Sequence, residues 1–337
     1  MRCCLLVTSF ICWNALARAA VAEIQRTIGD VVVTANMGGL LSGALAGGSA
    51  IADQARGPGS AEAYGWIKAE WTTDRGLAFG ALASGETASN RADTLSSNRM
   101  FCYIAEPWGR LEAGLTTGAA RRMSFYAPVV GSGQVRGDFA RYAGVSTLPW
   151  PLGISQSLKI VYFAPPSHGF GVGASWAPKV MRFGATQKDV LEVGLQYERP
   201  VSDWIVGASW AYVHSQQTLP RLQGINNWSV GLLGRRGKIV IGGAYIIHGS
   251  GNVDFSAFER KEINAGISWR EAKWRLALSG ARTRARRFQN DFIGLGGSYD
   301  LTAHVTFNTD LVGLRQRDVI KGDRSGFVVV SEIDLHL

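Results

Sequence analysis

Long apolar runs are missing from most of this sequence. Apolar residues make up 46% of the 337-residue chain, yet none of them form a stretch of about 18 or more after residue 22. A membrane-spanning helix is therefore not expected beyond that point. The apolar residues must instead be distributed in short stretches along the chain.

Cysteine is also scarce, and the few cysteines are placed unevenly. Three of the four, Cys3, Cys4 and Cys12, lie within the first 22 residues, which leaves Cys102 alone in the rest of the chain. Without the N-terminal segment, Cys102 has no partner for an internal disulfide. This distribution argues against a small secreted domain that depends on disulfides.

The first 22 residues have the pattern of a secretory signal peptide. Arg2 precedes an apolar run that extends to about residue 17, and the small residues Ala20 and Ala22 stand just before Glu23. We expect cleavage after Ala22 and a mature chain of residues 23–337. A retained anchor is the rival interpretation, but the run is shorter than the about 20 residues that a spanning helix needs. A lipoprotein signal at Cys12 fits less well.

Charge gives a further restriction. The chain has 35 basic and 26 acidic residues, and removing Arg2 and Arg18 with the signal leaves 33 and 26, a formal charge of +7. The charges are scattered, and export makes nucleic acid an unsuitable partner. Anionic solutes and the phosphates of lipopolysaccharide are the partners that a basic surface favours.

What the sequence does contain is an alternation of large apolar and small or polar residues. In the stretch 191–213, LEVGLQYERPVSDWIVGASWAYV, large residues such as Leu191 and Trp210 alternate with residues such as Gly194 and Ser209. This period of two predicts strands with two unlike faces. Because the second face consists mainly of Gly, Ser and Ala, we expect lipid on the bulky side and water on the other.

The same pattern recurs along the chain and predicts sixteen strands, an even number typical of bacterial single-chain barrels. Short turns and longer polar connections, such as residues 177–189, alternate between the strands. We therefore expect an all-β protein, a 16-stranded antiparallel transmembrane β-barrel. A soluble secreted β-sandwich or lectin is the alternative. The predicted strands are 30–46, 61–72, 76–87, 98–106, 109–117, 155–164, 168–177, 189–199, 202–214, 225–234, 237–247, 260–270, 273–283, 291–300, 302–315 and 326–337.

One connection, residues 118–154, is exceptional. It is long, has no clear periodicity and contains four arginines, aromatic residues and prolines, with Asp138 as its acid. Connections of this length in a compact structure tend to be functional. We expect it to pack on another part of the protein.

Two motifs around this connection resemble a known family. Gly109, Arg110, Leu111 and Gly114 precede it, and the stretch Lys159–Pro165, with Tyr162 and Ala164, follows it. These residues are similar to those of the general diffusion porins of Gram-negative bacteria, particularly the alphaproteobacterial type. The resemblance implies an inward-folded third external loop that narrows the lumen, a homotrimer, and passive diffusion of small hydrophilic solutes and ions across the outer membrane.

The sequence departs from that family in two respects. The chain ends in Leu337, where the family usually has Phe. The loop 118–154 has a net charge of +3, whereas porin loops tend to be acidic, so we expect a mild anion preference.

Parity along the strands places several charges on the water-facing side beside this loop. Together with loop residues they form the predicted pore constriction, where opposed charges create a field across the passage. A solvated position away from the narrowest point is the alternative for each. The predicted constriction residues are Arg121, Arg122, Arg136, Asp138, Arg141, Lys68, Glu70, Arg99, Arg110, Glu112 and Lys159.

Signals for catalysis are poor. The five histidines are dispersed, with no spacing typical of metal ligands, and there is no G-x-S-x-G motif. We expect no enzyme activity, no cofactor and no metal. A substrate-selective channel, or less plausibly an outer-membrane hydrolase with a Ser-His pair, remains the alternative function.

Two further features have no role in the pore. Arg282, Arg284, Arg286 and Arg287 lie near an external strand end, where they could contact lipopolysaccharide phosphates or be solvated. Cys102 lies two residues from both Met100 and Ile104 and therefore shares their side of the strand, so we expect it to face lipid.

Overall fold

The structure is a computed structural model of the full chain. It describes residues 22–28, 31–49, 59–88, 96–134, 137, 139–143, 156–182, 185–216, 224–249, 259–319 and 322–337. Residues 1–21 of the predicted signal peptide lie outside the described residues.

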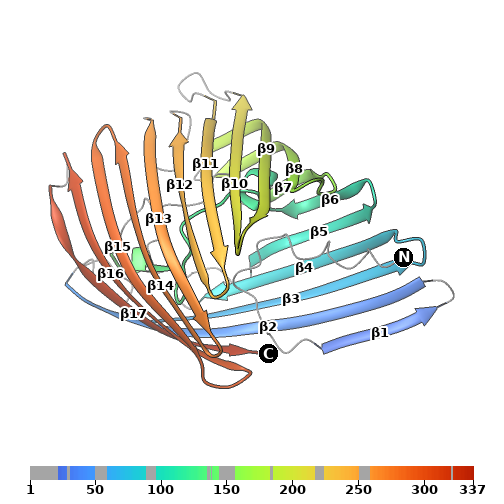
Figure 1. Ribbon diagram of the computed structural model, residues 1–337, viewed down its shortest axis with the longest axis horizontal. Helices are drawn as coiled ribbons and strands as arrows, with labels where there is room; N and C mark the ends of the chain where they lie inside the picture. The colour runs from blue at the N-terminus through green and yellow to red at the C-terminus, as the bar shows by residue number, and fades with distance from the viewer. Residues whose placement is uncertain are drawn as a thin grey trace.

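A single antiparallel sheet closes on itself as a barrel (Figure 1). Each strand from β2 to β17 pairs with its neighbour in the chain, and β17 pairs back with β2. Closure leaves every one of these strands with partners on both sides, as a lipid environment requires. The strands are β2 (Val31–Gly47), β3 (Gly59–Thr73), β4 (Ala78–Ala88), β5 (Ser96–Glu106), β6 (Gly109–Thr116), β7 (Ser157–Phe163), β8 (Phe170–Arg182), β9 (Ala185–Val201), β10 (Trp204–Gln216), β11 (Asn226–Arg236), β12 (Ile239–His248), β13 (Arg260–Glu271), β14 (Trp274–Ala285), β15 (Phe288–Asp300), β16 (Val305–Asp318) and β17 (Arg324–His336).

All sixteen predicted strands are present, and the barrel prediction is confirmed. One strand was not predicted: β1 (Ala22–Ile28) pairs with residues 31–37 of β2, whereas β17 pairs with residues 40–47 of the same strand. The strand β1 therefore continues the line of β17 beyond the C-terminus. It overlaps the predicted cleavage site, which is why the sequence pattern assigned it no strand.

The sequence analysis predicted a long connection at residues 177–189, and this prediction is wrong. Strand β8 continues to Arg182 and β9 begins at Ala185, with Lys179 facing Lys188 across the pair. Both faces of these strand ends carry polar residues, so the apolar alternation that identifies a strand within the lipid band is lost there.

The two ends of the barrel differ. Short connections such as 202–203, 237–238 and 272–273 lie at the end that also holds the C-terminus, here called the turn end. Long connections such as 249–259 lie at the opposite end, here called the loop end. In outer-membrane barrels the short turns are periplasmic and the long loops external.

Alternate residues of each strand face outward, and these are mostly large and apolar. Leu232 is 69% exposed and Ile293 is 61% exposed, as expected for side chains that contact lipid. Aromatic residues gather near the turn end, where Trp108 stacks on Tyr162 and Trp274 contacts Tyr299. Amphipathic rings favour the headgroup level of a membrane. No helix in the described ranges is long and apolar enough to span a membrane.

Two short helices, α1 (Ala119–Arg122) and α2 (Phe139–Ala143), belong to the connection between β6 and β7, residues 117–156, here called the inner loop. Both pack inside the barrel. Ala120 of α1 joins an apolar cluster with residues of β8 to β12, and Phe139 of α2 joins a second cluster with residues of β14 to β17.

Candidate functional site: the channel interior

The inner loop follows the inside of the barrel wall in strand order. Its backbone N–H groups donate hydrogen bonds to inward-facing side chains of successive strands. Ala119 N bonds to Ser175 Oγ of β8 at 3.1 Å, Phe125 N to Ser209 Oγ of β10 at 2.8 Å, Ala127 N to Asn264 Oδ1 of β13 at 2.9 Å and Gln134 N to Asp310 Oδ2 of β16 at 2.8 Å. The wall thus satisfies backbone donors that would otherwise be buried without partners.

Beyond β16 the loop is held by two further contacts. Ser132 Oγ donates to Glu332 Oε2 of β17 at 2.8 Å, and the hydroxyl of Tyr142 lies 3.1 Å from that of Ser60 on β3. Over the residues that the structure describes, the inner loop therefore covers the wall from β8 to β17, and α2 also reaches β2 at Ala44 and the loop end of β3 at Ser60.

Glycines on this part of the wall give the loop room to approach. A Cβ atom added at Gly242 would lie 2.8 Å from Tyr126 O, and one at Gly194 would lie 2.7 Å from Met123 Cβ. At Gly231 an added Cβ would overlap Phe125 O. These glycines share the inward register that the sequence pattern assigned to small residues. The small inner face is therefore explained by the loop that lies on it.

A buried ion pair anchors the start of the loop. Lys159 Nζ lies 2.9 Å from Glu192 Oε1, and both side chains are only 1% exposed. Glu192 also lies directly under Gly118, where any side chain would overlap its carboxylate. Lys159 is thus enclosed beneath α1, whereas the sequence pattern predicted it at the constriction.

A second ionic cluster joins the loop to the wall that it leaves uncovered. Arg122 Nη1 of α1 lies 2.6 Å from Glu112 Oε2 on β6, and Arg110 Nε lies 2.7 Å from the other oxygen, Glu112 Oε1. Glu112 is fully buried between the two guanidiniums. Arg122 also lies over the ring of Phe163 at 4.2 Å.

The cluster continues across β5 and β3. Arg110 lies over the ring of Tyr103 at 3.6 Å, and the Tyr103 hydroxyl donates to Glu70. Lys68 Nζ lies 3.0 Å from Glu70 Oε2, with both side chains about one-third exposed (31% and 30%). The uncovered wall from β3 to β6 therefore presents a connected network of charged and aromatic side chains to the lumen.

Arg122 keeps its positive charge within this network. Burial lowers the pKa of Arg122, a loop residue, while Glu112 opposes that shift and Arg99 adds to it. A guanidinium nevertheless remains protonated in proteins. The cations Lys68, Arg99, Arg110 and Arg122 against the acids Glu70 and Glu112 give four minus two, a net charge of +2.

Comparisons with known proteins agree with this architecture. A family model described as Gram-negative porin matches residues 7–318. The chain belongs to the Gram-negative porin family. No curated protein matches it.

Solved porin structures share the fold at low sequence identity. An anion-selective porin from Comamonas acidovorans is 12% identical, with 90% of this chain and 99% of that chain covered and a TM-score of 0.65. A porin refined at 1.8 Å resolution is 15% identical, with coverages of 89% and 99% and a TM-score of 0.61. A mutant of the Rh. blastica porin is 9% identical, with coverages of 89% and 99% and a TM-score of 0.58.

This porin is therefore a diffusion channel of the Gram-negative outer membrane that passes small solutes, and it is not an enzyme. The site residues predicted from the sequence fall into three groups. Lys68, Glu70, Arg110, Glu112 and Arg122 are joined by direct contacts that include Tyr103, and Arg99 shares the inward parity of Tyr103 on β5. Lys159 lies apart from them, beneath α1, while Arg121 is adjacent to Arg122 in α1 and half-buried. Arg136, Asp138 and the side chain of Arg141 lie outside what the structure describes.

The sequence analysis missed several residues of the interior. Tyr103 and Glu192 share the inward parity of their strands and could have been found on that basis. The hydrogen-bonding residues Ser175, Ser209 and Asn264 could not, because a small polar residue facing the lumen has the same pattern whether a loop or water covers it.

Proposed function

We propose that this porin is a general diffusion channel with a mild preference for anions, and that its constriction is the network around Glu112 on the uncovered wall. The observation that supports this proposal is the net charge of +2 on Lys68, Glu70, Arg99, Arg110, Glu112 and Arg122. Because low-dielectric walls concentrate the field of fixed charges, a small excess of one sign biases the ions in a narrow passage.

The acids of the covered wall are less available to bind a passing cation, because their oxygens already have partners within the protein. Asp310 accepts a hydrogen bond from the backbone N–H of Gln134, and Glu332 accepts hydrogen bonds from Ser42 and Ser132. Asp300 is paired with Arg275. The structural neighbour from Comamonas acidovorans is itself described as anion-selective, which agrees with the proposal.

The reversal potential of single channels in a KCl gradient tests the anion preference. We expect the sign that indicates faster passage of chloride. Neutralising the three partly exposed cations in Lys68→Gln/Arg99→Gln/Arg110→Gln should move the potential to zero or to the cation side. A cation-selective wild type would contradict the proposal. A substrate-selective channel would instead show saturable block by one solute.

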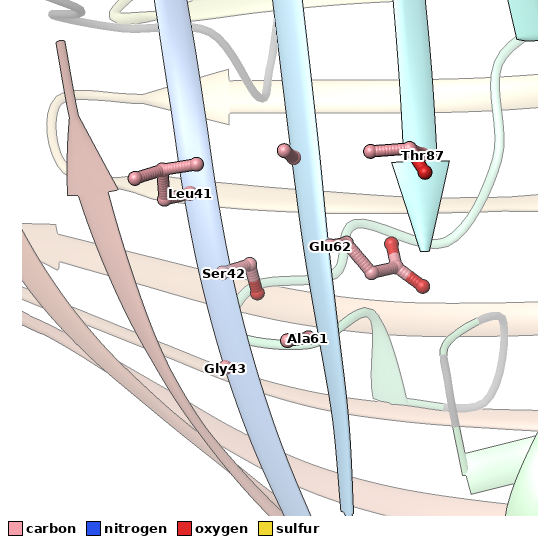
Figure 2. Close-up of a pocket in the computed structure, with 7 residues that line it drawn as sticks. Leu41, Ser42, Gly43, Ala61, Glu62 and Thr87 are labelled. Carbon is pink, nitrogen blue, oxygen red and sulfur yellow. The ribbon is translucent and has the colours of Figure 1, made fainter. Parts of the chain in front are cut away.

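We further propose that the outer face of β2 to β4 is the contact surface between subunits of a homotrimer. Among larger outward residues such as Leu45 and Ile67, this face carries a group of small ones, Gly43, Gly47, Ala61 and Ala63. A cavity of about 550 Å³ is formed by residues of β2, β3 and β4, among them the outward Leu41, Gly43, Ala61, Ala63 and Thr87 (Figure 2). The residues that line the cavity are Leu41, Ser42, Gly43, Ala61, Glu62, Ala63 and Thr87.

Two glycines of this face, Gly43 and Gly47, are not required by crowding within the chain. A Cβ added at Gly43 or Gly47 would meet no atom within 4 Å. Lipid contact alone favours larger side chains, such as Leu232 and Ile293 on other strands. A second copy of the chain that fits against this face accounts for the space, because close approach of two surfaces requires small residues.

Substitution of Gly43 tests this surface. Gly43→Leu should convert trimers to monomers in light scattering of detergent-solubilised protein, without changing the barrel. Gly280→Leu, which adds the same side chain to the outer face of β14 with only Phe292 O nearby at 3.6 Å, should leave the trimer intact. A trimer that persists in Gly43→Leu would refute the proposed contact surface.

Two details rest on the sequence patterns. We propose that residues 1–22 are a signal peptide and that residues 23–337 form the mature barrel, with residues 118–154 as the constriction loop; the intact mass of the purified protein tests the cleavage. The motifs around Arg110 and Lys159 support assignment to the alphaproteobacterial group of general diffusion porins.

A further inference from the structure

A belt of cationic side chains faces outward at the loop end of β13 to β16. It consists of Lys261, Arg282, Arg284, Arg315 and Arg317, here called the basic belt, and all five are exposed. These residues come from three different strands, so the pairing of the strands creates the belt.

The strand register sets the spacing of the belt. Lys261 faces Arg284, Arg284 faces Gln289, and Gln289 faces Arg317. Two residues closer to the turn end on the same strands, Arg282 and Arg315 face Asp291 from either side. Since neighbouring strands are about 4.8 Å apart, the belt extends over roughly 14 Å across three strand spacings.

The belt points away from the channel. Ser279 and Ala281 on the same strand face inward, where Ser279 bonds to Gln134 and Ala281 joins the apolar cluster around Phe139. Arg282 and Arg284 have the opposite parity and therefore face outward. The next outward residues toward the turn end are aliphatic, with Ile263 55% and Ile293 61% exposed.

The belt therefore lies at the boundary between the apolar band and the external loops. In an outer-membrane barrel, this boundary is at the level of the headgroups of the external leaflet.

Nearby acids compensate only part of the positive charge. Asp291 accepts hydrogen bonds from Arg282 and Gln289, and Glu259 lies 3.2 Å from Lys261. Five cations and these two acids leave a net charge of +3.

Unlike Arg282, the arginines Arg284, Arg315 and Arg317 of the belt are not held in ion pairs. Arg284 donates to the neutral Gln289 Oε1, at 3.1 Å through Nη2. Within the ranges that the structure describes, Arg315 and Arg317 form no ion pair. Arg286 and Arg287, in the turn above, have interactions of their own and are not counted in the belt. Exposed like charges on adjacent strands repel one another, so an anionic ligand would relieve the cost of this arrangement.

We propose that the basic belt binds the phosphate groups of anionic lipid headgroups in the external leaflet. Guanidinium groups match phosphate oxygens with two parallel hydrogen bonds. A lipid fits the site better than a free anion does, because its acyl chains would contact Ile263 and Ile293 while its phosphates meet the arginines. This interaction is separate from the proposed solute passage, since no belt residue faces the lumen.

Native mass spectrometry of the full-length protein in a neutral detergent provides the test. Diphosphorylated lipid A is the probe, with its dephosphorylated form and inorganic phosphate as separate arms. The variant Arg284→Gln/Arg317→Gln removes two charges from the belt. Its matched control, Lys179→Gln/Lys188→Gln, removes two exposed cations that face each other at the loop end of β8 and β9.

We expect the belt variant to bind diphosphorylated lipid A about 30-fold more weakly than the parent, since each basic residue near an anionic membrane surface contributes roughly a factor of five. The control should weaken binding distinctly less than the belt variant does, because Lys179 and Lys188 lie outside the belt and lack its further cations, and Arg284→Lys/Arg317→Lys should fall between the parent and the belt variant. Single-channel conductance of all variants should match the parent, which shows that the barrel is intact.

Three outcomes would overturn the proposal. The belt variant could bind the diphosphorylated lipid as tightly as the parent does. The dephosphorylated lipid could bind equally well, which would place recognition in the acyl chains. Inorganic phosphate could bind as tightly as the lipid, which would make the belt a site for a free anion.

Discussion

The two parts of the lumen wall differ in composition and in what covers them. From β8 to β17 the inward residues are largely small or hydrogen-bonding, such as Gly231, Ser209 and Asn264, and the inner loop lies on them. From β3 to β6 they are charged and aromatic, such as Lys68 and Tyr103, and form the ionic network. Small inward residues thus indicate a wall that is covered by protein, while large charged ones indicate a wall that contacts water.

The two parts are connected at one point. Arg122 belongs to the loop but pairs with Glu112 on the uncovered wall. The three variants below change this connection, the covered wall and the uncovered wall in turn.

Loss of Arg122 should have the largest effect. Arg122→Ala leaves the fully buried Glu112 with Arg110 as its remaining cationic contact, and removing one partner of a buried ion pair typically costs about 3–5 kcal/mol. We expect a lower thermal unfolding temperature and a weaker anion preference. The double variant Glu112→Gln/Arg122→Met removes one charge of each sign, so it should recover both. If the double variant behaves like the single one, the pair does not stabilise the loop.

A larger residue on the covered wall should have an intermediate effect. Gly231→Leu inserts a side chain where the Phe125 carbonyl lies, and overpacking of this kind costs about 1–3 kcal/mol. The loop should leave the wall more often, which limited trypsin cleavage after Arg121 and Arg122 would detect. Gly280→Leu, on the outward face, should remain resistant. Equal resistance of both variants would mean that the loop does not need the space at Gly231.

A change on the uncovered wall should have the smallest effect on stability and a clear effect on selectivity. Lys68→Gln removes a partly exposed ion pair with Glu70, and such pairs contribute about 0–1 kcal/mol. We expect the unfolding temperature to stay nearly constant while the reversal potential moves toward zero. An unchanged potential would place Lys68 away from the ion path.

The barrel itself could be predicted from the sequence because lipid imposes a regular constraint. Every outward residue within the apolar band must be compatible with hydrocarbon, so stretches such as Ile263, Ala265 and Ile267 repeat with a period of two. The constraint ends where the strands leave the lipid. This is why the ends of β8 and β9, around Lys179 and Lys188, were predicted as a loop.

The interior could be predicted only in part. Parity identified Arg110 and Glu112 as inward residues, and the composition of the loop identified Arg122 as a candidate. The partner of each charge depends on how the loop lies in the lumen, and the loop has no period to reveal its path. Lys159 shows the consequence, because its inward parity is the same as that of Arg110 but its carboxylate partner, Glu192, lies beneath α1.

The most direct test asks which wall contacts the water-filled passage. In a Cys102→Ala background, Lys68→Cys places a thiol on the uncovered wall and Ser279→Cys places one on the covered wall, where Ser279 is 1% exposed. A water-soluble methanethiosulfonate reagent is added while single-channel conductance is recorded. The structure predicts a stepwise change for Lys68→Cys and none for Ser279→Cys. Equal modification of both, or modification of Ser279→Cys alone, would contradict the path of the inner loop described above.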